Sequence, residues 1–415
     1  MKAKSDAHGK GESVRVLGRR SRYRSRSLAL LACLLTLIPI AARAAEPAVQ
    51  PSAGQSANPF LFGIAAHAWW LDPKVYGDQL FPTLDDLKVT TVRLSIDWRR
   101  FESTPGTYDW SLYDRVLGAL ATRHIVIVAD FNTIPSWAST DVEGCADSAR
   151  EISACELRND MYPAFERAVH AAVSRYSWID HWEFWNEPEI WDHFGGTNYL
   201  LDLRLFYDIA HRINPEISVA ACTLAGPEFM EWIYNVSDAW YGKGYQPWDA
   251  IAYHPYNLDV VPGADGQPLP IRYDRILDLH RIMMEQSGPE MKMWITEYGW
   301  INEDKRHGHD LVESLDWMKQ QPYIEFAHLH MLHDWSEVDP NGSYGLMAIV
   351  PDPSGARRLT PQTRFTPKQG YYNVFQRYVH DNLPATWSRN GPDVPRTGQN
   401  FSARILSLLR WIGVR

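Results

Sequence analysis

Two acidic segments of this sequence carry residue types that could do chemistry. Glu187 follows the apolar and aromatic run 181–185, and Glu297, which lies 110 residues later, follows the run 292–296. Each run is typical of a buried parallel strand, so both carboxyl groups would stand at strand ends. A pair of carboxyl groups on one rim can cleave a glycosidic bond, because one protonates the leaving oxygen while the other attacks the sugar carbon or activates a water molecule.

The elements that must position these residues are short apolar runs alternating with amphipathic segments, a pattern typical of parallel strands and covering helices. We expect strands near residues 60–66, 89–96, 124–130, 180–185, 217–222, 249–253, 292–296 and 325–332. The expected helices lie near residues 111–121, 159–175, 199–212, 227–240, 271–286, 309–320 and 368–380. This order predicts a (β/α)8 TIM barrel, with its chemistry at the carboxyl ends of the strands. Residues 334–366, rich in Pro, Gly and Asp, are expected to form one long loop after the last strand.

The N-terminal residues are typical of a targeting segment. Basic residues crowd positions 1–27, and an uncharged apolar run follows from Leu28 to Ala42. The run is short for a membrane span, and small residues surround Arg43, so we expect a signal peptide over 1–44. An uncleaved membrane anchor is the alternative. The chain would then comprise a linker over 45–57, a catalytic domain over 58–382 and a C-terminal extension over 383–415, and the protein would be exported, either periplasmic or secreted.

Composition bounds the possible partners. Of the 415 residues, 45% are hydrophobic and 22% charged, which suits one large catalytic domain. Residues 45–415 contain 31 Lys and Arg against 48 Asp and Glu, a formal charge of −17 that argues against nucleic acid as a partner. The apolar residues of 401–412 follow helical spacing with Arg residues among them. We expect this segment to dock on the barrel or stay disordered, with contact to a membrane surface as the alternative.

The cysteines and histidines indicate a disulfide rather than a metal site. Cys145 and Cys155 flank a polar stretch, and in an exported protein such a pair is typical of a disulfide. Cys222 lies in an apolar strand, where a thiol usually behaves as a small hydrophobic group. The closest grouping of histidines is 328, 330 and 333. The first two could share a face of a strand, but no third ligand is apparent, and we expect no metal.

The motifs around the two glutamates resemble a known group of enzymes. Trp-Asn-Glu-Pro at 185–188 and Thr-Glu-Tyr-Gly at 296–299 resemble glycoside hydrolase clan A, over roughly residues 58–380. The resemblance implies a retaining mechanism, with an acid/base Glu at the end of strand four and a nucleophile Glu at the end of strand seven. The expected strands put Glu187 and Glu297 at these places. Within the clan the chain is most similar to family 39, which includes β-xylosidases, α-L-iduronidases and bacterial exopolysaccharide hydrolases, although family 5 shares most of these features.

Two further residues have implied roles beside the glutamates. Arg93 is a charge inside an apolar strand, where it would be costly without a carboxylate partner. The resemblance implies that this partner is Glu297, and a purely structural ion pair is the alternative. Asn186 resembles the asparagine of the clan that hydrogen-bonds the sugar 2-hydroxyl, and an ordinary turn residue is the alternative.

The remaining substrate-binding candidates lie at other strand ends. His254 and Tyr256, at the end of the sixth strand, are similar to clan residues that touch the nucleophile or the sugar. His67 ends the first strand, where a structural histidine is the alternative. Trp335 follows the eighth strand, where the clan commonly stacks an aromatic ring under the sugar. Trp137 is a candidate for a neighbouring subsite, since flat aromatic faces suit sugar rings.

We therefore expect a retaining hydrolase of β-glycosidic bonds that uses no metal or organic cofactor. An endo-acting enzyme on an extracellular oligosaccharide or polysaccharide is favoured, because only about 35 residues follow the expected barrel. Family 39 β-xylosidases and iduronidases generally carry an added β-sandwich. An exo-acting β-glycosidase is the alternative, and transglycosylation would use the same residues. A glycan-binding protein without catalysis is the alternative of another class, although it would need no paired acid and nucleophile.

Overall fold

The computed structural model describes residues 60–66, 73–146, 155–190, 197–256, 273–300, 307–335, 343–350 and 363–383. The chain divides into two compact units, residues 1–55 and 56–415, and all described residues belong to the second unit. The expected signal peptide and linker lie outside the described residues, as does the C-terminal extension apart from its first residue. The site candidate His67 also lies outside them.

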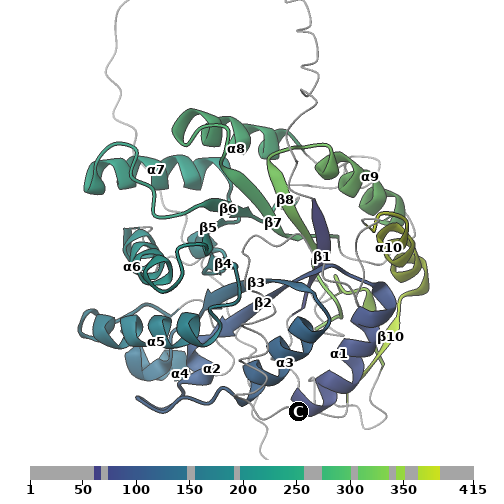
Figure 1. Cartoon of the computed structure of the whole chain (residues 1–415), viewed down its shortest axis with the longest axis horizontal. Coiled ribbons are helices and arrows are strands. Elements are labelled where there is room, and N and C mark those ends of the chain that lie inside the picture. Colours follow the sequence, from purple (N-terminus) through teal and green to yellow (C-terminus); the bar gives the residue numbers. More distant parts are fainter. Residues whose placement is uncertain are drawn as a thin grey trace, which may run out of the picture. The chain divides into compact units, whose positions relative to one another are not determined.

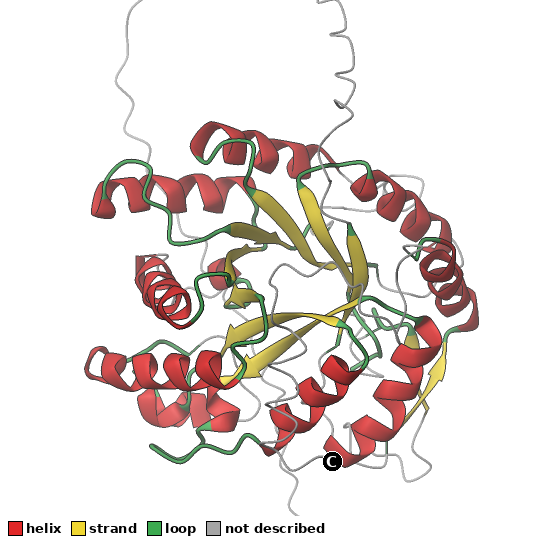
Figure 2. Cartoon of the chain, in the orientation of Figure 1, coloured by secondary structure: helices red, strands yellow, loops and turns green. Residues whose placement is uncertain are grey.

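Eight parallel strands form a closed barrel in which each strand pairs with the next one along the chain and β8 pairs with β1. The strands are β1 (Leu61–Ala65), β2 (Thr91–Asp97), β3 (Val126–Asn132), β4 (His181–Phe184), β5 (Ser218–Thr223), β6 (Ala250–Tyr253), β7 (Lys292–Tyr298) and β8 (Ile324–Leu329). Helices surround these strands (Figures 1 and 2). The predicted (β/α)8 TIM barrel and each of its eight predicted strands are confirmed.

Within the described residues, eight longer helices cover the outside of the barrel. They are α1 (Pro73–Leu87), α3 (Ser111–Thr122), α5 (Tyr162–Arg175), α6 (Thr197–Ile213), α7 (Pro227–Tyr241), α8 (Tyr273–Gln286), α9 (His307–Lys319) and α10 (Gln369–Asp381). Two short helices, α2 (Trp98–Phe101) and α4 (Val142–Ala146), lie in loops. The seven predicted helices are confirmed. The sequence prediction does not include α1, because Gly77 and Pro82 inside it are typical of turns.

The side chains that point into the barrel change from apolar to polar along the strands. Alternate residues of a barrel strand point inward. A small buried cluster fills part of this interior with Val128, Ala220, Cys222, Ala250, Ala252, Trp294 and Phe326. Two residues further along their strands, the inward positions become polar: Asp130 follows Val128 on β3, and Thr296 follows Trp294 on β7. The apolar layer thus supports a polar layer at the carboxyl ends, where the predicted site lies.

The prediction of one long loop over residues 334–366 is wrong in part. Strands β9 (Met347–Val350) and β10 (Arg364–Pro367) form a separate antiparallel pair within and just beyond this region. Each has only four residues, and the surrounding Pro and Gly conceal so short a signal.

Two features of the described residues bear on the expected compartment. The predicted disulfide is confirmed, since Cys145 and Cys155 are joined with their Cα atoms 5.9 Å apart. Among the described helices, none combines the length and apolar character that crossing a bilayer requires.

Candidate active site

The side chains of Glu187 and Glu297 meet at the carboxyl ends of β4 and β7. Glu187 lies three residues beyond the end of β4, and Glu297 is the last residue but one of β7. One carboxylate oxygen of each and a ring nitrogen of His254 all lie within 4.8 Å of one another. His254 Nδ1 is 2.8 Å from Glu187 Oε1 and 3.9 Å from Glu297 Oε2. The two carboxyl groups therefore face the same small space.

The turn after β4 holds Glu187 in an uncommon backbone conformation. Trp185 and Glu187 have φ angles of 68° and 47°, in the left-handed region that residues with side chains rarely adopt. Trp185 is fully buried, and its ring centroid lies 5.8 Å from that of Phe184. Such conformations persist only where the surrounding structure holds them. The turn therefore depends on its neighbours to present the Glu187 carboxyl group.

Glu189 is one of those neighbours, and it ties this turn to the loop after β5. Its Oε1 accepts hydrogen bonds from Thr223 Oγ1 at 2.5 Å and from the backbone N–H groups of Leu224 and Ala225 at 2.6 Å each. A buried carboxylate with three donors on one oxygen fixes the relative position of the two loops.

Arg93, on β2, is the centre of a buried ionic network. Its Nη1 donates to Glu297 Oε1 at 2.5 Å, which places the predicted partner of Arg93 beside it. Its Nε and Nη2 donate to the two oxygens of Glu183 at 2.8 and 2.9 Å. Nη2 also donates to Asn186 Oδ1 at 3.0 Å. One guanidinium group therefore orients Glu297, Glu183 and Asn186 together.

The charges of this network follow from burial and pairing. Burial disfavours the Glu183 carboxylate, but Arg93 and His254 outweigh this effect and lower its pKa to about 2. Asp130 accepts a hydrogen bond from Ser95 Oγ at 2.8 Å and lies 3.7 Å from Arg93. Burial raises the pKa of Asp130 to about 8. Arg93 also lies closer to Glu183 and Glu297 than to Asp130, so these two glutamates are its main partners.

Glu297 is surrounded by donors in addition to Arg93. Tyr256 donates its hydroxyl to Glu297 Oε2 at 2.9 Å, and His330 Nδ1 lies 3.2 Å from the same oxygen. Gly299, just after β7, allows the backbone of His330 to pass close to it. A Cβ atom at Gly299 would lie only 2.5 Å from the carbonyl oxygen of His330. Donors on both carboxylate oxygens favour the ionised form of such a group.

The orientation of the His254 ring follows from its partners. Nε2 lies 2.9 Å from Thr296 Oγ1, which is 3.3 Å from Glu183 Oε1. Ionised Glu183 only accepts hydrogen bonds, so Thr296 donates its single proton there and accepts one from Nε2. With a proton on Nε2, the hydrogen bond between Nδ1 and Glu187 contains a proton that can belong to either group. His254 and Glu187 therefore share one proton.

The neighbours of His254 favour this extra proton. Burial opposes a charge on the ring, whereas the carboxylates of Glu297 and Glu183 favour it, and the pKa of His254 is raised above its ordinary value. The pair can therefore retain its proton at a pH where an isolated histidine is neutral.

The other predicted substrate residues lie in different surroundings. Asn186 and Tyr256 belong to the site through Arg93 and Glu297, as described above. Trp335 is half-buried just after β8, where the sequence places it. Trp137 donates its ring N–H to the backbone oxygen of Glu102 at 3.0 Å, and its ring packs edge-on against Trp98. These contacts tie Trp137 to the fold around β2.

The histidines grouped in the sequence have separate partners. His328 Nε2 lies 3.0 Å from Thr91 Oγ1, and His333 Nδ1 lies 2.8 Å from the backbone oxygen of Asp334. Burial lowers the pKa of His328 to about 3, so this ring is neutral. His330, in contrast, contacts Glu297.

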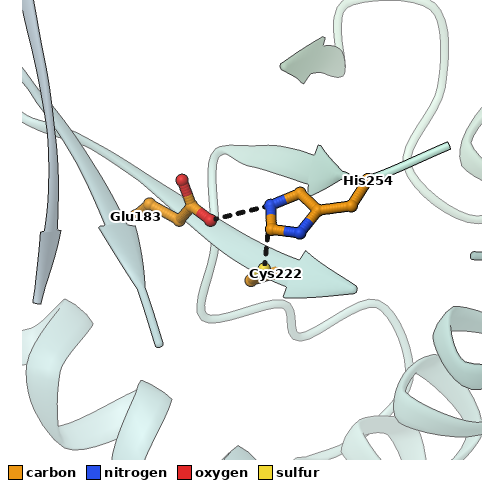
Figure 3. Close-up of side chains that lie close together, drawn as sticks. All are labelled: Glu183, Cys222 and His254. Atoms are coloured by element: carbon orange, nitrogen blue, oxygen red, sulfur yellow. Dashed lines mark hydrogen bonds and ion pairs between the residues drawn. The ribbon is translucent and has the colours of Figure 1, made fainter. Parts of the chain in front are cut away.

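Among the described residues, two groups have donor atoms close enough to hold a metal ion. One is Glu187, His254 and Glu297, and the other is Glu183, Cys222 and His254 (Figure 3). In the second group Arg93 occupies both oxygens of Glu183, and burial raises the pKa of the Cys222 thiol, which disfavours the thiolate that metals prefer. His254 belongs to both groups and is already hydrogen-bonded. These engaged donors do not favour a metal site.

Sequence reasoning missed three residues of the site. Glu183, four residues before Glu187, is a charge inside an apolar strand, the same signal that singled out Arg93. Thr296 precedes Glu297 but carries no signal of its own. Cys222 is buried, as expected of a hydrophobic residue, but its sulfur also contacts the backbone N–H of Glu187 at 3.5 Å and His254 Nε2 at 3.8 Å.

Comparison with solved structures finds glycosidases whose fold is similar to that of this chain. A family 39 glycoside hydrolase from the gut symbiont Bacteroides cellulosilyticus matches 78% of this chain at 18% identity, with a TM-score of 0.53. A β-xylosidase from Caulobacter crescentus matches 76% at 18% identity, with a TM-score of 0.54. The β-glycosidase BGL167 matches 82% at 15% identity, with a TM-score of 0.56. The chain shares the fold of these three glycosidases.

The matches differ in how much of the known structure they cover. The chain spans 99% of BGL167, but only 64% of the Bacteroides glycoside hydrolase and 67% of the Caulobacter β-xylosidase. No family model matches the sequence, and no curated protein matches it either. At these identities the likeness to glycoside hydrolases concerns the fold, and the chemistry must be argued from the site.

Proposed function

We propose that this protein is a retaining β-glycoside hydrolase, with Glu297 as nucleophile and Glu187 as acid/base. The observation that carries the proposal is the separation of the two carboxyl groups, whose nearest oxygens lie within 4.8 Å at the ends of β7 and β4. Retaining enzymes keep their carboxyl groups about 5–5.5 Å apart, and inverting enzymes need about 6.5–9.5 Å to admit a water molecule.

The partners of each carboxyl group support the two roles. Glu297 is held by Arg93 and Tyr256, donors that favour an ionised nucleophile. Glu187 instead shares a proton with His254, as an acid/base must be able to give and regain one. The likeness to known β-glycosidases and β-xylosidases agrees with β-glycosides as the substrate class.

The reaction follows in two displacements. Glu297 attacks the anomeric carbon while Glu187 gives its proton to the departing oxygen, which forms a glycosyl ester and breaks the glycosidic bond. Glu187, now ionised, takes a proton from water as that water attacks the same carbon. The ester bond breaks, Glu297 returns as a carboxylate, and Glu187 is protonated again. Asn186, oriented by Arg93, would hydrogen-bond the sugar 2-hydroxyl.

The finer substrate assignment is part of the proposal. We infer endo action on an extracellular oligosaccharide or polysaccharide, with exo action on small β-glycosides as the alternative. The buried disulfide supports an exported protein, because disulfides persist in oxidising compartments. Product lengths early in a digest distinguish the two modes, since an endo-acting enzyme releases mixed oligosaccharides and an exo-acting one releases a single short product.

Trapping the covalent intermediate tests the mechanism. The protein is incubated with activated 2-fluoro glycosides of several sugars, and its intact mass and peptide map are then measured. We expect one added sugar mass on the peptide that contains Glu297, because the 2-fluoro group slows breakdown of the ester. The labelling sugar identifies the residue before the cleaved bond. A label on Glu187, or no label from any sugar that the protein turns over, would refute the assigned roles.

Replacing His254 with Asn is expected to move the alkaline limb of the kcat/KM profile to lower pH by about one unit or more. Asn cannot take up the proton that lies between His254 Nδ1 and Glu187 in the wild type. That proton must then reside on a carboxyl group, and carboxyl groups ordinarily release a proton at lower pH than histidine does. The ionisable groups facing His254 are Glu187, Glu183, Glu297 and the neutral thiol of Cys222.

A matched histidine provides the control for this pH profile. His211 pairs with Asp249 at 3.0 Å, at the end of helix α6, and its replacement with Asn should leave the alkaline limb in place. An unchanged alkaline limb in the His254 variant would show that His254 does not hold the catalytic proton.

A further inference from the structure

Cys222 lies directly beneath the acid/base turn, at the carboxyl end of β5. Its side chain is fully buried, and its Sγ atom accepts a hydrogen bond from the backbone N–H of Glu187 at 3.5 Å. The same sulfur lies 3.8 Å from His254 Nε2. Figure 3 shows dashed lines from the sulfur and from Glu183 to the imidazole ring, and both contacts are with Nε2. Cys222 thus contacts both the backbone of Glu187 and the residue that shares its proton.

The backbone of Glu187 needs such a contact. Its φ angle of 47° is in the left-handed region, which costs free energy unless the surroundings hold it. An N–H group in a partly buried turn also needs an acceptor, and within the described ranges Cys222 Sγ is the acceptor found for this one. Loss of that acceptor would allow the turn to relax and move the carboxyl group.

The properties of the thiol suit this position. Sulfur is large and polarisable, so it can accept a hydrogen bond at a distance where a hydroxyl oxygen would be too far away. The neutral thiol adds no charge beside Glu183, Glu187 and His254. On β5, Ala220 and Ala221 have no polar side chain and Thr223 bonds Glu189 instead, so the Cys222 sulfur is the acceptor that this strand presents to the Glu187 N–H group.

We propose that Cys222 is a positioning residue for the acid/base: its sulfur holds the Glu187 backbone and the His254 ring so that the carboxyl group is aimed at the departing oxygen. This inference rests on the proposed acid/base role of Glu187. Cys222 acts through Glu187 and His254 rather than on the sugar itself. Cys222 should therefore affect the rates only of those steps in which Glu187 transfers a proton.

The dependence on the leaving group isolates such steps. A 2,4-dinitrophenolate group departs without protonation, whereas a phenolate group needs help from an acid. The first bond-breaking step is measured as kcat/KM for the 2,4-dinitrophenyl and phenyl glycosides of the sugar that the wild type accepts, beginning with β-xylosides and β-glucosides. Cys222→Ala should lower the value for the phenyl glycoside about fivefold to tenfold, the range expected for loss of one hydrogen bond. The value for the dinitrophenyl glycoside should change less than about twofold.

Three variants accompany this measurement. Cys222→Val also removes the acceptor while filling the space, and it should show the same selective loss if the Ala variant folds poorly. Cys222→Ser keeps a short acceptor and should recover part of the activity. Val219→Ala truncates a buried apolar residue near the start of the same strand, and it should leave the ratio of the two substrates unchanged.

The outcomes separate this inference from the proposed function. Glu187→Ala should lose about a hundredfold or more on the phenyl glycoside but little on the dinitrophenyl glycoside. If Glu187→Ala loses the same factor on both, or the protein hydrolyses neither glycoside, the proposed acid/base role fails and the inference about Cys222 fails with it. If Glu187→Ala is selective but both Cys222→Ala and Cys222→Val are not, only the role of Cys222 is refuted. The same selectivity in Val219→Ala would also refute it.

Discussion

Replacing Glu297 with Gln is expected to lower kcat/KM by at least about a thousandfold, because an amide cannot form the glycosyl ester. Gln has the same size as Glu, its amide oxygen can still accept the hydrogen bond from Arg93, and its NH2 group can donate to the Tyr256 oxygen. The fold should therefore persist, and binding of an oligosaccharide substrate should remain measurable by calorimetry. Turnover and binding together distinguish a hydrolase from a protein that only binds glycans.

A control for the loss of one carboxylate is available on the neighbouring strand. Glu325, on β8, accepts a hydrogen bond from the Trp294 ring N–H at 2.9 Å, and Glu325→Gln keeps an oxygen for this contact. That variant should keep activity within about twofold of the wild type, because the change keeps the size of the side chain and its hydrogen bond. Near-normal turnover in Glu297→Gln would remove Glu297 from the reaction and overturn the proposed mechanism.

The sequence predicts the barrel well because each of its strands is a short run of buried apolar residues. The strand from Lys292 to Tyr298, for example, has six buried residues out of seven and needs no information from the rest of the chain. Helix α1 is harder to predict, because Pro82 opposes a helix while the buried Leu80, Leu84 and Leu87 favour one. The packing of these leucines against the barrel outweighs the effect of Pro82, and the segment forms a helix.

The candidate site can likewise be predicted from the sequence only in part. Glu187 and Glu297 are recognisable because each follows a strand-like run. The pairing of Glu183 with Arg93 depends on the inward direction of residues on separate strands, which sequence spacing alone does not define. The contact of Cys222 with Glu187 also depends on the left-handed turn after β4, and a local sequence gives little warning of such a turn.

Arg93 is expected to matter for folding as much as for chemistry. Its side chain is buried and bonds to both Glu183 and Glu297. Replacing Arg93 with Met would remove the guanidinium group that both carboxylates share, and breaking a buried pair in this way costs about 3–5 kcal/mol. We expect the free energy of unfolding, measured with denaturant by circular dichroism, to fall by about that amount.

A partly exposed arginine provides the control for this cost. Arg123 pairs with Asp85 at 3.1 Å, but its side chain retains 27% of its exposed area and that of Asp85 retains 39%. Water screens such a pair, so Arg123→Met should cost no more than about 1 kcal/mol. Equal losses in the two arginine variants would show that the buried network does not stabilise the barrel.

The pH dependence of the Arg93 variant identifies the cause of its instability. In the wild type the pKa of Glu183 is lowered to about 2, so the stabilisation from this pair is present above the ordinary Glu pKa of about 4.3 and is lost as the pH falls toward 2. Arg93→Met lacks this stabilisation, and its carboxylates can instead relieve their burial by taking up protons. The difference in unfolding free energy between wild type and variant should therefore narrow as the pH falls through this range. A constant difference would indicate lost packing around the arginine side chain rather than lost charge.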